Sequence, residues 1–134
     1  MATYQEFEVY VRSKYPVKKN TKDTSEGFMC LEIPLPNDRS HLVFVHPGSE
    51  IKKGGEIADI VAMLGELSGS KLEKALEAAL NLPLGGLVKI NDVIALRHSI
   101  PLTDVDESEI AMALLFTAMS ADILEEKFVG GDKY

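Results

Sequence analysis

Residues 84–102, LGGLVKINDVIALRHSIPL, are the stretch that decides the fold. Two short apolar strands, 87–90 and 93–98, are separated by Asn91-Asp92, and both of these residue types tolerate the left-handed backbone that a tight turn needs. A two-residue turn pairs residue 90 with 93 and residue 88 with 95, which makes both faces of the hairpin largely apolar. We therefore expect this hairpin to be covered on both sides.

Helices and further strands surround the hairpin in the sequence. Three Ser/Thr/Asp-x-x-Glu capping boxes, at Thr3, Ser70 and Asp106, predict helix starts. The helices are expected over residues 3–14, 70–82 and 106 to about 128, the remaining strands over 28–35, 41–45 and 57–67, and loops over 17–27 and 47–56. Residues 57–67 lack clean alternation, so a helix stays the alternative there. The order α-β-β-β-α-β-β-α predicts an α+β single domain over residues 1–134, with an antiparallel sheet packed against helices.

The bulk composition excludes several classes of protein. With 134 residues and 14.7 kDa the chain suits one domain. A net charge of −7 argues against nucleic acid or an anionic membrane as partner. The single cysteine cannot form an internal disulfide, no apolar run approaches a membrane span, and the N-terminus lacks a secretion signal. These features predict a cytoplasmic protein.

No motif in the chain indicates a catalytic, metal or cofactor site. His41 and His46 lie five apart on one predicted strand, so they point to opposite faces and cannot share an ion. Cys30 has no second cysteine, and a buried structural role is the more common one for such a residue. We expect no cofactor and no metal. Alternatives stay open: a small regulatory domain on the same fold, or a small enzyme or ligand-binding domain whose site collects the scattered residues His41, His46, Arg97 and His98.

The last predicted helix has more apolar surface than one core contact requires. One stripe consists of Ile110, Leu114, Ala118, Ala121 and Leu124, and a second, offset stripe of Ala111, Leu115 and Met119. Such a helix is either deeply buried or meets another chain with its second stripe. Ala111, Leu115 and Met119 are therefore a possible dimer face.

The C-terminal half also carries a family resemblance. The segments that carry it are Leu64-Gly65-Glu66-Leu67, LEKALEAALNLP, Gly85-Gly86 and VIALRHSIPLTDVDESEI with the helix that follows. In this pattern the chain resembles the type III secretion chaperone superfamily, which includes the Tir-chaperone-like and YbjN-like domains. The resemblance implies a non-enzymatic, acidic, cytoplasmic homodimer that binds a protein segment, and it favours a strand over residues 57–67.

The resemblance also suggests where a partner would bind. In secretion chaperones the partner's segment lies along the first helix and the first three strands. Carried over by position, and expected to face outward, the partner-binding residues are Tyr4, Phe7, Val11, Phe28, Cys30, Val43 and Val45.

Overall fold

A computed structural model describes residues 3–18, 29–48 and 56–130. The helices in these residues are α1 (Tyr4–Lys14), α2 (Gly69–Ala78) with a short 3-10 turn η1 (Ala79–Asn81), and α3 (Glu107–Leu124) with a π turn η2 (Glu125–Val129). The strands are β1 (Val17–Lys18), β2 (Met29–Pro34), β3 (Ser40–Pro47), β4 (Ile57–Gly65), β5 (Gly86–Ile90) and β6 (Val93–Pro101).

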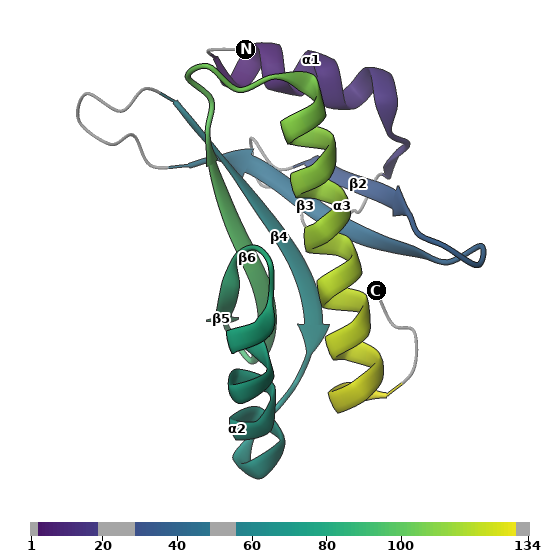
Figure 1. The fold of residues 1–134 in the computed structure, drawn as a ribbon, viewed down its shortest axis with the longest axis vertical. Coiled ribbons are helices and arrows are strands. Elements are labelled where there is room, and N and C mark those ends of the chain that lie inside the picture. The colour runs from purple at the N-terminus through teal and green to yellow at the C-terminus, as the bar shows by residue number, and fades with distance from the viewer. Residues whose placement is uncertain (1–2, 19–28, 49–55, 131–134) are drawn as a thin grey trace.

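The strands of the described residues form one six-stranded sheet in the order β1-β2-β3-β4-β6-β5. All neighbouring pairs are antiparallel. Figure 1 shows α3 lying across one face of this sheet, α1 crossing the upper end of α3, and α2 below the lower end of the sheet. The predicted α+β class and element order are confirmed for the described residues.

The hairpin of β5 and β6 has the predicted register. Ile90 pairs with Val93 and Val88 with Ala95, and Asn91 takes the positive φ of 53° that the turn requires. β6 is central and its residues 94–96 are buried, whereas β5 is an edge strand that stays exposed or half-buried. The expectation that the hairpin is covered on both sides is therefore correct for residues 94–96 of β6, and wrong for β5 and for the exposed Arg97.

The ambiguous segment 57–67 contains the strand β4. Every residue of β4 except Met63 is buried, because the strand lies between β3 and β6 and both of its faces are covered. A strand buried on both faces has no reason to alternate apolar and polar residues. The pairing of β4 with β6 shifts between Met63 and Gly65, which is the mark of a β-bulge.

Three predicted boundaries are wrong. Residue 47, assigned to a loop, is the last residue of β3. Val17 and Lys18, assigned to a loop, pair with β2 as a short edge strand. The second helix starts at Gly69 after Ser68, one residue before the predicted capping box at Ser70. Most of the two predicted loops, residues 19–27 and 49–55, lies outside the described residues. The caps at Thr3 and Asp106 are as predicted, since each side chain accepts a hydrogen bond from the backbone N–H three residues on.

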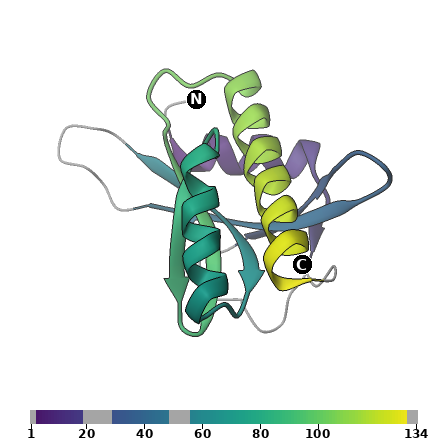
Figure 2. The same cartoon turned by 60° about the horizontal axis from the view of Figure 1, so that its bottom comes forward.

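The main core lies between the sheet and the two helices α1 and α3, which Figure 2 shows on the same side of the central strands. A second, smaller cluster lies on the opposite face of the sheet. Its buried members are Cys30, Phe44, Val61 and Ala95.

Candidate functional site

Six of the seven residues predicted to bind a partner lie in the described part of the chain and are buried, so the expectation that these six face outward is wrong. Tyr4, Phe7 and Val11 form the face of α1 that packs on the sheet. Val43 and Val45 of β3 belong to the same main core, and Cys30 belongs to the smaller cluster on the opposite face. Phe28 lies outside the described residues. The outward aromatic and apolar patch that these residues would have formed is therefore core.

The reason lies in the pairing of β2 with β3. Leu31 pairs with Val43 and Met29 with Val45, so these residues share the face that the helices cover. Cys30 pairs with Phe44 and points the other way. A single strand shows which residues alternate, but the side that the helices cover depends on tertiary packing.

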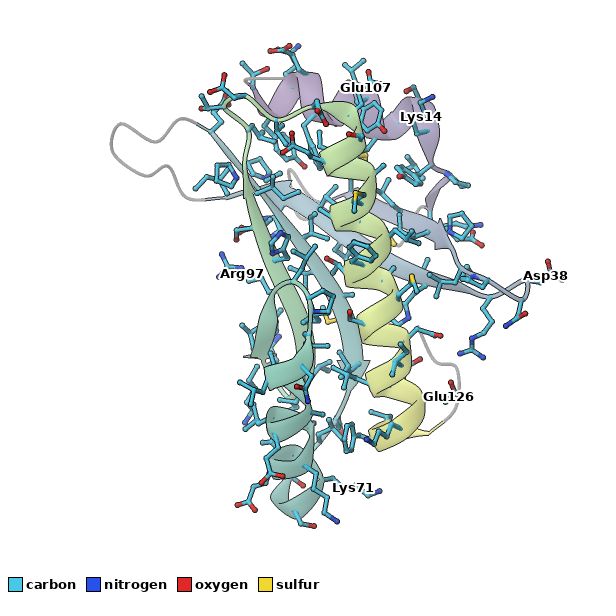
Figure 3. The ribbon with its side chains drawn as sticks, viewed as in Figure 1. Lys14, Asp38, Lys71, Arg97, Glu107 and Glu126 are labelled. Atoms are coloured by element: carbon cyan, nitrogen blue, oxygen red, sulfur yellow. The ribbon has the colours of Figure 1, made fainter. Side chains whose placement is uncertain are left out.

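The outer face of α3 leaves large apolar side chains exposed. Residues 110–121 carry no charged side chain, and Figure 3 shows the acidic side chains Glu107 and Glu126 near opposite ends of the helix. Met112 is 53% exposed and Ile123 is 59% exposed, with Phe116 and Met119 half-buried between them. These four residues, spaced i, i+4, i+7 and i+11, form one stripe on the helix, which we call the outer stripe.

The predicted dimer face overlaps this stripe only at Met119. The first predicted stripe, headed by Ile110, is buried as expected. Ala111 and Leu115 are half-buried and lie between the core side and the outer stripe. Met112, Phe116 and Ile123 were not among the predicted contact residues, although the charge-free run over 110–121 indicates a helix that contacts protein on more than one side.

A hollow lies on each side of the outer stripe. The larger, about 270 Å³, lies between α3 and β6 and is mainly apolar; its lining residues include Leu84, His98, Met112 and Phe116. Burial lowers the pKa of His98, which favours its neutral form and keeps the hollow apolar. The smaller hollow, about 170 Å³, lies beside Met119 and Ile123. The outer stripe is therefore a ridge between two depressions.

A polar cluster around Asp59 lies on the sheet face opposite α3. The Arg97 guanidinium donates to Asp59 Oδ2 at 2.9 Å, the Ser99 hydroxyl donates to Oδ1 at 2.5 Å, and His46 Nε2 lies 3.8 Å from Oδ2. Figure 3 shows Arg97 pointing away from α3. Burial by itself raises the pKa of Asp59, but the hydrogen bonds from Ser99 and Arg97 outweigh it and hold the pKa below its usual value. Asp59 therefore stays ionised at neutral pH.

The Asp59 cluster does not have the order that nucleophilic catalysis needs. An activated serine donates to a base, usually a histidine, and the acid holds the far side of that base. Here the acid lies between Ser99 and His46, and the serine hydroxyl donates to the acid itself. The cluster instead joins β3, β4 and β6 in register, because His46 pairs with Asp59 and Asp59 with Ser99.

The four scattered residues of the alternative prediction therefore separate into two pairs. His46 and Arg97 meet at Asp59 on the sheet face opposite α3. His41 and His98 lie on the face that carries the helices, where His98 lines the larger hollow. His41 is buried with Asp122 and Glu125, the one group in the described part of the chain with the donor atoms for a metal ion. The opposite orientation of His41 and His46 was predicted correctly.

Comparisons with known proteins do not assign the chain to a family. Neither the known protein-family models nor the curated proteins gave a match. Among the helices that the structure describes, none has the combined length and apolar character that crossing a membrane demands.

Proposed function

We propose that this chain is a protein-binding module without catalytic chemistry that works as a homodimer paired through the outer stripe of α3. The observation that carries the proposal is the exposure of Met112 and Ile123 on a helix with no charge from residue 110 to 121. Isolated exposed apolar residues are ordinary, but a continuous stripe of them marks an interaction surface.

The geometry of the stripe suits a second copy of the same chain. From Met112 to Ile123 the stripe runs about 17 Å along the helix, which is long enough for helix-to-helix packing. In a two-fold dimer the same patch faces itself. A ridge between two hollows can satisfy that requirement, because the ridge of each copy enters a hollow of the other.

The open edge of β5 is the place we assign to a partner's segment. Within the described residues β5 has a neighbour, β6, on one side only. An extended segment can add to such an edge through main-chain hydrogen bonds, with the half-buried Leu87 and Val88 supplying apolar contacts. This assignment replaces the buried residues of α1, β2 and β3, and it departs from the arrangement in secretion chaperones, where the partner's segment lies along the first helix and the first three strands.

Sedimentation equilibrium of the full chain from 1 to 100 µM tests the pairing. We expect a species of twice 14.7 kDa. A chain that stays monomeric over this range contradicts the homodimer. A Lys89→Pro variant tests the edge, because the pairing of Ile90 with Val93 across the two-residue turn directs the N–H groups of residues 88 and 90 to β6 and that of residue 89 outward. This variant is compared with the wild type in affinity capture from native cells followed by mass spectrometry. Capture of the same proteins by both forms contradicts the β5 assignment.

A further inference from the structure

His41, Asp122 and Glu125 form a buried group beneath α3. His41 comes from β3, Asp122 from α3 and Glu125 from the first position of the π turn. All three residues are buried. One ring nitrogen of His41 and one carboxylate oxygen each of Asp122 and Glu125 lie within 4.8 Å of one another. Asp122 and Glu125 are three residues apart on one helical segment, which places both carboxylates on the same side.

The orientation of His41 directs one ring nitrogen at the carboxylates. Its Nε2 lies 3.1 Å from the carbonyl oxygen of Met63. A carbonyl can only accept, so Nε2 carries the hydrogen and donates. Nδ1 is buried, lies 3.6 Å from Asp122 Oδ1, and has no hydrogen-bond partner among the described residues. In the neutral ring, a lone pair on Nδ1 therefore points at a carboxylate, an arrangement that a bound cation would stabilise.

Two backbone irregularities hold this group in place. The Gly130 N–H donates to the Glu125 carbonyl at 2.8 Å, closing the wide turn of the π helix at Glu125 itself. The β4 bulge begins at Met63, whose carbonyl holds His41. π turns and bulges interrupt regular hydrogen bonding and occur frequently at functional sites.

We propose that His41 Nδ1 and the carboxylates of Asp122 and Glu125 bind one divalent first-row transition-metal ion, with Zn²⁺ the best match. One imidazole nitrogen together with carboxylate oxygens is a common ligand set for such ions. A histidine that ligates a metal usually donates its other ring N–H to a carbonyl or carboxylate, as His41 does to the Met63 carbonyl. Zn²⁺ holds nitrogen and oxygen donors at about 2.0–2.2 Å. Binding therefore draws the three donor atoms together by about an ångström through side-chain rotation.

Arg39 is compatible with this ion. Its Nε and Nη2 donate to Asp122 Oδ2 and Oδ1, each at 3.0 Å. A carboxylate offers about four acceptor positions, so each oxygen keeps one for a metal. Arg39 is therefore paired with Asp122 without filling every acceptor position of its carboxylate. The smaller hollow reaches Asp122 and gives the ion a route from solvent.

Calorimetric titration of the untagged full chain with Zn²⁺ tests the site, with Co²⁺ absorption as a second readout of nitrogen and oxygen ligation. We expect one Zn²⁺ per chain. His41→Asn and Glu125→Gln should each weaken binding by at least about tenfold. The matched control is His46→Asn, because His46 lies on the opposite face of the sheet; its Zn²⁺ affinity should equal that of the wild type.

Three results would overturn the proposal. They are no Zn²⁺ binding by the folded wild type at 1 mM ion, equal affinity in Glu125→Gln, and a comparable loss in His46→Asn. Circular dichroism confirms folding of each variant. If His41→Asn does not fold, Glu125→Gln decides the question, because the amide keeps the shape of the side chain and removes its charge.

Discussion

Replacing the two most exposed residues of the outer stripe should separate the proposed dimer without unfolding the chain. The change is the double substitution Met112→Ser and Ile123→Ser. Both side chains are a little more than half exposed, so little of the fold's own packing depends on their outer halves. The free energy of unfolding of each protomer should therefore change far less than the free energy of association.

The size of the effect follows from the exposed fractions. Full burial of a large aliphatic side chain stabilises by about 1.5–3 kcal/mol. The exposed half of Met112 or Ile123 is therefore worth about 1 kcal/mol when a partner covers it. A two-fold dimer buries both side chains of both protomers, so the double substitution removes about 4 kcal/mol of association free energy. At about 1.4 kcal/mol per tenfold change, the Kd should rise roughly a thousandfold.

Sedimentation velocity over a concentration series measures the Kd. The matched control is Val9→Ser on α1, which removes an apolar side chain that is 66% exposed but lies outside the outer stripe. Its Kd should equal that of the wild type. Two results would contradict pairing through the outer stripe. The first is a double variant that is folded by circular dichroism and dimerises as tightly as the wild type, and the second is a Val9→Ser variant whose dimer is weakened as strongly as that of the double variant.

Three further predictions concern stability. Leu114→Ala, in the main core, should lower the free energy of unfolding by about 2–5 kcal/mol in urea denaturation, whereas Leu80→Ala, at a side chain 88% exposed, should change it by less than about 0.5 kcal/mol; similar losses would contradict the packing. Gly48→Ala should lower the free energy of unfolding by about 1–3 kcal/mol in the same assay, because the new Cβ would lie 2.9 Å from Ile57 Cγ2. An unchanged free energy of unfolding would contradict this close contact. The pKa of Asp59 is lower in the folded chain than in the unfolded chain, so ionised Asp59 contributes fully to the free energy of unfolding above about pH 4, and this contribution is lost as the pH falls through the folded pKa. The urea midpoint should therefore fall less steeply from pH 7 to pH 2 in Asp59→Asn than in the wild type. Parallel curves for the two proteins would contradict this.

The sequence by itself determined the local elements. The hairpin register follows from a two-residue turn between apolar runs, so the pairing of Ile90 with Val93 was predictable. The caps at Thr3 and Asp106 depend only on residues three positions apart. Such features need no knowledge of distant residues, and they were sufficient for the α+β class and the element order.

The tertiary structure decided which faces are covered. Apolar alternation shows that a strand has two kinds of face, but only the packing of α1 and α3 determines that Val43 and Val45 lie in the core. The same holds for α3, whose charge-free run over residues 110–121 gives no indication of which apolar residues face solvent.

The buried group of His41, Asp122 and Glu125 shows most clearly what the sequence alone does not determine. His41 is 81 residues from Asp122 in sequence, so no spacing rule connects them. They meet because β3 and α3 cross at that point, and the free energy of burying His41, Asp122 and Glu125 depends on contacts between distant segments. Sequence specified which chemical groups the chain has, and tertiary packing determined which of them lie together.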